Sequence, residues 1–198
     1  MDRIGIFGGT FNPVHIAHLI AAEEVKQQMH LNKVLFIPSA DPPHKDGASI
    51  VAADKRMEML NLAIKGNPSF ESSDIELKLS ENSKSYTVNT LMALRELHKD
   101  EPVKFYLIIG MDQLIELHTW KDPGKLFVLS EVVVMNRPGY FAHEAVNDFA
   151  GRVHYVPIPS MEISSTDIRH RINEMRPITY MVGAKVENYI IKNNLYKI

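Results

Sequence analysis

Apolar residues form two kinds of pattern along this chain. Short apolar runs, such as VKFYLII at 103–109, are typical of strands buried in a sheet. Residues 74–79 alternate instead, with Ile75, Leu77 and Leu79 on one side, which predicts an edge or half-exposed strand. The predicted strands cover residues 3–7, 33–37, 74–79, 103–109, 131–135 and 153–156.

Other segments repeat their apolar residues every three or four positions, which indicates helices with one buried face. The predicted helices cover residues 15–29, 53–65, 88–97, 165–175 and 183–192. Because strands and helices alternate, the sequence predicts an α/β fold with a Rossmann-like, doubly wound and mainly parallel sheet. The length of 198 residues suits a single domain, 1–198, with the helices from about residue 165 packing on it.

Composition excludes several classes of protein. The net charge of −2 argues against a broad basic surface, so nucleic acid is not expected as a partner. The absence of cysteine excludes disulfides and thiolate chemistry. No apolar window is long enough to span a membrane, and residues 1–3 lead directly into a strand-like run rather than a signal peptide. We therefore expect a cytoplasmic protein without a membrane partner.

Polar segments follow the predicted strands. Glycine or proline is mixed there with hydroxyl, amide or charged side chains, whereas the connections at the other end of the sheet are plainer. Ligands of open parallel sheets bind beyond the carboxyl ends of the strands, so we expect these segments to gather around one cleft. They are residues 8–18, 38–45, 85–87, 110–112, 136–139 and 163–169.

The first segment, GGTFNPVHIAHL, begins with two glycines that let a ligand approach the main chain. The N–H groups and helix start that follow form an anion site, but the spacing is that of neither a dinucleotide fingerprint nor a P-loop. His15 and His18 are three residues apart, on one helix face. They could instead bind zinc, which needs a third protein ligand, or they could be ordinary packed or solvated histidines.

The segment ISSTDIR, residues 163–169, places three hydroxyl side chains at a predicted helix start. Arg169 follows within the first turn and could grip a phosphate group with two hydrogen bonds. The alternative is a simple helix cap beside a solvated arginine. The stiff PPHK segment, ending at Lys45, is more typical of a surface turn when taken alone.

Four further residues have two interpretations each. Asp112 could accept ribose hydroxyls or cap a helix, and Thr87 could also be a cap. Trp120 could stack on a planar ring or pack in the core. Arg137 could reach a nucleotide or lie in solvent.

Together these residues resemble a known family. GGTFNPVHIAHL is similar to the G-G-x-F-D-P-x-H-x-G-H signature of the nucleotidylyltransferase superfamily, and ISSTDIR to its I-S-S-T-x-I-R motif. With PPHK, SYT, GMD, a tryptophan and NRPG, the chain resembles the bacterial nicotinate-nucleotide adenylyltransferases from residue 3 to its end. It departs from the usual pattern at Asn12, where aspartate is common, and at Ala17, where glycine is common.

The resemblance implies that ATP and nicotinate mononucleotide are joined to deamido-NAD and pyrophosphate, with Mg²⁺ bridging the ATP phosphates and no protein ligand to the metal. It implies catalytic roles for His15, His18 and Arg169. The residues it assigns to ATP are Gly8, Gly9, Thr10, Phe11, Gly110, Asp112, Arg137, Ser164, Ser165 and Thr166. Those it assigns to nicotinate mononucleotide are Ser39, His44, Lys45, Tyr86, Thr87 and Trp120.

Alternatives remain at this point. The acceptor could be nicotinamide mononucleotide or phosphopantetheine, although SYT followed by a tryptophan fits the nicotinate branch better. A non-catalytic nucleotide sensor is a second alternative, but such regulators usually carry an added module for which 198 residues leave no room. A homodimer is also left open.

Overall fold

The computed structural model describes residues 1–40, 50–79, 86–136 and 148–197. Three residues with predicted roles, His44, Lys45 and Arg137, lie outside these ranges.

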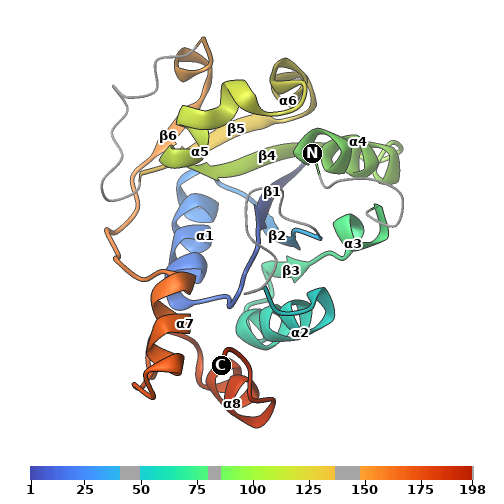
Figure 1. The fold of residues 1–198 in the computed structure, drawn as a ribbon. Coiled ribbons are helices and arrows are strands. Elements are labelled where there is room, and N and C mark those ends of the chain that lie inside the picture. Colours follow the sequence, from blue (N-terminus) through green and yellow to red (C-terminus); the bar gives the residue numbers. More distant parts are fainter. Residues whose placement is uncertain (41–49, 80–85, 137–147, 198) are drawn as a thin grey trace.

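The centre of the molecule is a six-stranded sheet in which every pair of neighbours is parallel (Figure 1). Its order is β3-β2-β1-β4-β5-β6. This confirms the predicted parallel α/β fold. The strands are β1 (Asp2–Gly9), β2 (Lys33–Pro38), β3 (Phe70–Ser72), β4 (Val103–Gly110), β5 (Glu131–Met135) and β6 (His154–Val156).

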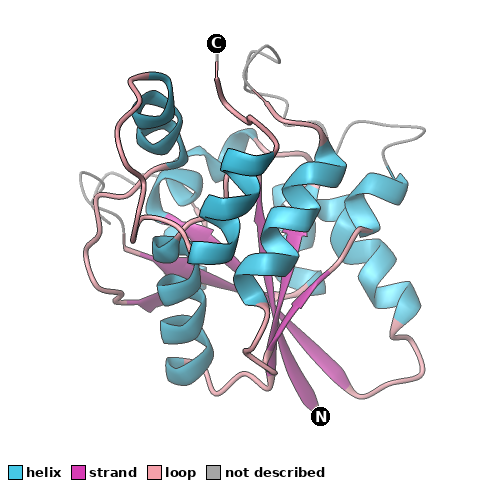
Figure 2. Cartoon of the chain, turned by 90° about the horizontal axis from the view of Figure 1, so that it is seen from below, coloured by secondary structure: helices cyan, strands magenta, loops and turns pink. Residues whose placement is uncertain are grey.

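Helices cover both faces of the sheet, and one layer of them lies in front of the strands in Figure 2. The first face is covered by α1 (Ile16–Gln28), α2 (Ala53–Ile64), α7 (Ser165–Asn173) and α8 (Ala184–Lys192). The second is covered by α3 (Ile75–Leu79), α4 (Thr87–Leu97), α5 (Met111–Glu116) and α6 (Pro123–Leu129). Two short 3₁₀ turns, η2 (Leu117–Thr119) and η4 (Ala150–Arg152), complete the described elements.

The central strands read as unbroken apolar runs because both of their faces are buried. In β4, Phe105 and Leu107 belong to the core beneath α3–α6, whereas Tyr106 and Ile108 belong to the core beneath α1, α2, α7 and α8. A strand of an antiparallel sheet with one wet face would alternate instead. The C-terminal helices contribute Ile168, Val186 and other side chains to the same core as α1 and α2.

One strand prediction was wrong. Residues 75–79 form the short helix α3, and the edge strand is β3, a few residues earlier. Alternation over six residues also places Ile75 and Leu79 four apart, on one side of a helical turn, so the pattern fits both structures. Ile75 is buried, while Leu79 is 38% exposed. Strand β3 has only three residues, too few to show a pattern.

The strand order reverses direction beside β1. The chain leaves β1 towards β2 and β3 on one side, then crosses to β4, β5 and β6 on the other. Ligands of such sheets bind outside the carboxyl ends of the strands at this reversal, which here are Gly8 and Gly9 in β1 and Gly110 in β4. In the described part of the chain, none of the helices is both long enough and apolar enough to span a bilayer.

Candidate active site

The two glycines that end β1 do different things. A Cβ built on Gly8 would meet nothing within 4 Å, so one side of the main chain is open there. A Cβ on Gly9 would lie 3.1–3.3 Å from the ring of Phe11, so glycine is needed for that ring to pack. Gly8 therefore offers main chain to a ligand, and Gly9 shapes the loop behind it.

Phe11 fixes the loop from within the core. Its φ of 48° lies in the left-handed region, which is unfavourable for a bulky residue, and its side chain is only 2% exposed. The ring packs 5.9 Å from Phe7, 5.9 Å from Phe36 and 5.1 Å from His18, measured between centroids. Its side chain is therefore structural, and only its backbone can face a ligand.

The two histidines stack on each other at the start of α1. His15 is the residue before the helix rather than part of its first turn, and the ring centroids are 3.6 Å apart with 27° between the planes. The backbone N–H of His15 donates to Nδ1 of His18 at 3.2 Å. Because Nδ1 accepts this bond, the neutral His18 ring carries its proton on Nε2. His18 thus presents an N–H donor at its outer nitrogen.

The start of α7 is attached to the loop that leads to these histidines. Ser165 Oγ donates to the carbonyl of Pro13 at 2.8 Å, and Arg169 Nη1 donates to the carbonyl of Asn12 at 3.0 Å. Arg169 Nη2 also donates to Thr166 Oγ1 at 3.2 Å. Ser164 Oγ caps the helix by accepting from the N–H of Asp167. The structure therefore brings the two end motifs of the chain together.

Arg56 was missed by sequence reasoning. It is 1% exposed, and its guanidinium donates to the carbonyls of Thr10 (2.8 Å), Val51 (2.9 Å) and Ala40 (3.4 Å). Burial lowers the pKa of Arg56. The one available signal was its place on the apolar face of α2, which carries Met59 and Leu60 one turn later.

Ser39 lies next to Gly9 at the ends of β1 and β2. Its backbone N–H donates to the carbonyl of Gly9 at 2.8 Å. Its Oγ is buried and, within the ranges that the structure covers, has no hydrogen-bond partner. Buried hydroxyls usually have a partner, so Ser39 is suited to bind a ligand group.

Gly110 and Asp112 lie at the carboxyl end of β4. Gly110 occupies the N-cap position of α5, and its N–H donates to Oε1 of Gln113 at 2.9 Å. Asp112 lies within the first turn and is therefore not the N-cap residue. A Cβ on Gly110 would collide with Oδ1 of Asp112. The glycine therefore lets the Asp112 carboxylate fold back over the end of the strand.

The aromatic residues assigned to the acceptor lie on the second face of the sheet. Tyr86 rather than Thr87 is the N-cap of α4, and Thr87 is its first residue. Lys121 Nζ lies 4.7 Å from the centroid of the Tyr86 ring, so the segment containing Trp120 meets the start of α4. Trp120 is partly buried against the core beneath α4 and α6. Lys121 is a second residue that sequence reasoning missed.

No three His, Asp or Glu side chains come together as a metal site in the portion of the chain that the structure describes. In the glycine loop, the backbone carbonyls of Thr10, Asn12 and Pro13 accept hydrogen bonds from Arg56, Arg169 and Ser165.

Known proteins with similar sequences agree on one family. The model of the family described as cytidylyltransferase-like matches residues 6–171. A protein of Desulfitobacterium hafniense strain Y51, named a probable nicotinate-nucleotide adenylyltransferase, is 40% identical over 99% of this chain and 96% of its own length. A protein of the same name from Thermomicrobium roseum is 40% identical over 100% of this chain and 92% of its own length.

Solved structures share the fold at lower identity. The nicotinic acid mononucleotide adenylyltransferase of Plasmodium falciparum, solved with NaAD, superposes with a TM-score of 0.80 at 20% identity and covers 99% of this chain and 98% of its own. The same enzyme solved with APC gives a TM-score of 0.78.

Proposed function

The chain belongs to the cytidylyltransferase-like family, and on that premise we propose that it is a nicotinate-nucleotide adenylyltransferase. It joins ATP and nicotinate mononucleotide to deamido-NAD and releases pyrophosphate, a step of NAD biosynthesis. A phosphate oxygen of the mononucleotide bonds to the α-phosphorus of ATP while the bond from that phosphorus to the bridging oxygen breaks. The attacking oxygen is already ionised at neutral pH, so no general base is required.

The observation that carries this proposal is the attachment of Ser165 and Arg169 to the carbonyls of Pro13 and Asn12, directly before the histidine pair. Both substrates are polyanions that repel each other. The site must therefore supply positive charge and N–H donors where negative charge develops. A glycine turn, an imidazole N–H, a helix start and a guanidinium form such a set.

We assign His18 to the α-phosphoryl group, because its outer nitrogen is the donor. His15 supports the phosphates at the start of α1, and the open backbone at Gly8 and the N–H groups of the following loop bind them from the other side. Arg169 and the start of α7 hold the terminal phosphates and the leaving pyrophosphate, and they counter the charge on that group as it departs.

The remaining residues divide between the two nucleosides. Gly110 and Asp112 hold the adenosine ribose at the end of β4. Ser39, Tyr86, Thr87 and Trp120 hold the mononucleotide. The proposed roles of His44, Lys45 and Arg137 concern residues outside the described ranges and stay predictions.

The groups that we expect to favour the acid over the amide lie at the start of α4. The nicotinate carboxylate needs N–H donors, and α4 begins at Thr87 with N–H groups that have no partner inside the helix. The ammonium group of Lys121, 4.7 Å from the Tyr86 ring, adds positive charge beside this helix start. Neither feature favours a neutral amide.

Mg²⁺ enters this proposal with ATP. In proteins it commonly keeps several waters and binds through substrate phosphates, so it does not require an acidic cage. The donor set at this site, N–H groups and cations, fits a phosphate chain that brings its own ion. The cytoplasmic location and the absence of a nucleic-acid partner stay predictions, and so does the possible formation of a homodimer.

The test is product analysis after incubation with ATP and Mg²⁺ and, in parallel, nicotinate mononucleotide, nicotinamide mononucleotide or phosphopantetheine. We expect deamido-NAD and pyrophosphate in equal amounts, and a kcat/KM for the acid at least tenfold above that for the amide. No dinucleotide from nicotinate mononucleotide would reject the proposed activity. Equal kcat/KM for acid and amide would reject only the account of selectivity.

A further inference from the structure

We propose that Tyr196, near the C-terminal end of the chain, is a positioning residue for this site. Its hydroxyl fixes Asn12 and thereby holds the carbonyl to which Arg169 is bonded. This inference rests on the proposed adenylyltransferase activity, because it concerns the geometry of the guanidinium that holds the leaving pyrophosphate.

Asn12 is the junction through which Tyr196 acts. The phenol donates to Oδ1 of Asn12 at 2.9 Å, and the same oxygen accepts from the backbone N–H of Val51 at 3.2 Å. Asn12 is only 3% exposed. Its backbone carbonyl accepts from Nη1 of Arg169 at 3.0 Å. One residue therefore connects the C-terminal segment, the approach to α2 and the start of α7.

The chain turns sharply to bring Tyr196 to this junction. Asn193 is the C-cap of α8, and Asn194 after it is in the left-handed region at φ 49°. The N–H of Asn194 donates to the carbonyl of Ile191, and the N–H of Leu195 donates to the carbonyl of Ile190. This pair of bonds is the Schellman motif. Tyr196 is itself left-handed at φ 64°, an unfavourable conformation for a bulky residue. Such outliers persist where surrounding contacts determine them.

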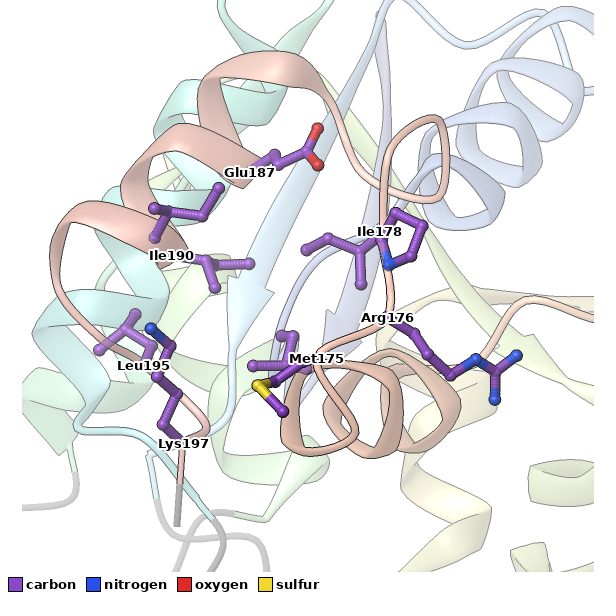
Figure 3. Close-up of a pocket in the computed structure, with 10 residues that line it drawn as sticks. Met175, Arg176, Ile178, Glu187, Ile190, Leu195 and Lys197 are labelled. Carbon is purple, nitrogen blue, oxygen red and sulfur yellow. The ribbon is translucent and has the colours of Figure 1, made fainter.

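The residues on either side of Tyr196 lie near α7 and α8. Leu195 and Lys197 line a cavity of about 360 Å³ between α7 and α8, together with Ile178 and Ile190 (Figure 3). Leu195 is 6% exposed and belongs to the core of this face. The burial of Leu195 in this core holds the C-terminal segment against the protein, which places the hydroxyl of Tyr196 next to Asn12.

The surroundings keep this hydroxyl protonated. Burial raises the pKa of Tyr196 far above its ordinary value, although the nearby guanidinium groups of Arg169 and Arg56 oppose the shift. A neutral phenol remains a donor throughout the range in which the enzyme would be assayed. Because Tyr196 keeps its proton, its hydrogen bond to Asn12 does not change with pH in that range.

The test compares Tyr196→Phe with Tyr189→Phe. Tyr189 lies on α8, and its hydroxyl contacts Glu58 of α2 rather than the Asn12 loop. Each variant removes the phenol oxygen of one partly buried tyrosine in the same region. We expect Tyr196→Phe to lower kcat by about five- to tenfold, the effect of losing one hydrogen bond that holds the transition-state geometry, with KM for ATP within about twofold. Tyr189→Phe should keep the kcat of the wild type.

A second readout separates positioning from packing. If Tyr196 acts through Arg169, its substitution should have no further effect once Arg169 is gone. In an Arg169→Ala background we therefore expect Tyr196→Phe to change the residual kcat by less than about twofold. Melting temperatures of all variants establish that the compared proteins are folded.

Three results would overturn the inference: a Tyr196→Phe enzyme with wild-type kcat, equal losses in both phenylalanine variants, or losses that multiply with Arg169→Ala. In each of these the wild type makes deamido-NAD, so the proposed function stands. A wild type that makes no dinucleotide rejects the proposed function, and this inference with it.

Discussion

At the scale of single residues, the two histidines differ more than their sequence spacing suggests. His15 is 7% exposed, and its backbone N–H is bonded to the ring of His18. His18 itself is partly exposed. The backbone N–H of His15 is bonded to Nδ1 of His18, so it orients that ring and fixes which of its nitrogens carries the proton. For this reason we propose His18, rather than His15, as the donor to the reacting phosphate.

His18→Ala should lower kcat by about 10²–10³, the usual loss when one donor to developing charge is removed. ATP affinity should change by only a few fold, because the glycine loop and Arg169 still bind the phosphates. Steady-state kinetics and ATP titration measure the two effects separately. His118→Ala, on the exposed turn η2, is the control and should behave as wild type. A kcat for His18→Ala within twofold of wild type would contradict the assignment.

Gly8→Ala should leave folding intact and impair ATP binding. Nothing lies within 4 Å of the added methyl in the protein, so the melting temperature should stay within about 2 °C of wild type. In our proposal the methyl occupies the space of a phosphate, so KM for ATP should rise at least tenfold. Gly124→Ala is the control, because a Cβ on Gly124 in α6 also meets nothing within 4 Å and Gly124 has no proposed contact with ATP. An unchanged KM in Gly8→Ala would remove this glycine from the ATP site.

At the scale of elements, three helices on one face of the sheet end in the same way. The residues after α1, α7 and α8 include His30 (φ 50°), Met175 (φ 55°) and Asn194 (φ 49°), all left-handed. Each is followed by a residue whose N–H bonds back to the helix, at Lys26, Arg171 and Ile190. Glycine is the usual residue at this position, so none of the three ends is optimised for stability.

Met175→Gly should therefore stabilise the protein. Met175 is 94% exposed, so little packing is lost, and removing the Cβ relieves a left-handed conformation that costs about 1–2 kcal/mol. After the entropy of glycine is subtracted, we expect a gain of about 0.5–1 kcal/mol, or about 1–4 °C in melting temperature. Met92→Gly, at a half-exposed position inside α4, should destabilise by about 1 kcal/mol. Thermal or urea unfolding decides the sign for both.

At the scale of the whole molecule, the reversal of strand order beside β1 collects residues that are far apart in the sequence. Gly8 and Gly9, the Ser39 turn and Gly110 all end neighbouring strands, and α7 then adds Arg169 from more than 150 residues away. Side-chain hydrogen bonds also join strands β4, β5 and β6 to one another. Glu131 in β5 bonds Lys104 of β4 at 2.8 Å and His154 of β6 at 3.0 Å.

The Glu131 cluster predicts an acid-dependent loss of stability. The hydrogen bond from Lys104, followed by that from His154, lowers the pKa of Glu131, so the folded state favours the ionised carboxylate. Its contribution is complete above the ordinary glutamate pKa of about 4.3 and disappears as the pH falls through the lowered value. Because the group is 37% exposed, we expect at most about 1 kcal/mol.

Glu131→Gln should therefore be less stable than wild type at pH 7, and the difference should shrink as the pH falls below about 4. Urea unfolding at several pH values gives the comparison. Glu116→Gln, on the exposed end of α5, should show no such difference. A gap between Glu131→Gln and wild type that stays constant down to pH 3 would contradict the role of the carboxylate charge.

The amino-acid sequence alone was enough to predict the parallel α/β fold, because strands buried on both faces appear as unbroken apolar runs and one-sided helices repeat their apolar residues with a period of 3.6. It also predicted that the glycine loop, the histidine pair and the Arg169 segment lie together, because glycine, histidine and arginine in those places suit a phosphate ligand. It misread residues 74–79, since six residues fit a strand and a helical turn equally well.

The contacts that hold those motifs in place became visible in the folded molecule. Arg56 and Tyr196 gave little or no sequence signal, because each bonds a residue of the glycine loop that is more than 40 positions away in the sequence. Likewise, no local pattern shows that Lys121 meets Tyr86. Chain segments distant in sequence come together only when the sheet closes, so the contacts that position the site are properties of the folded molecule.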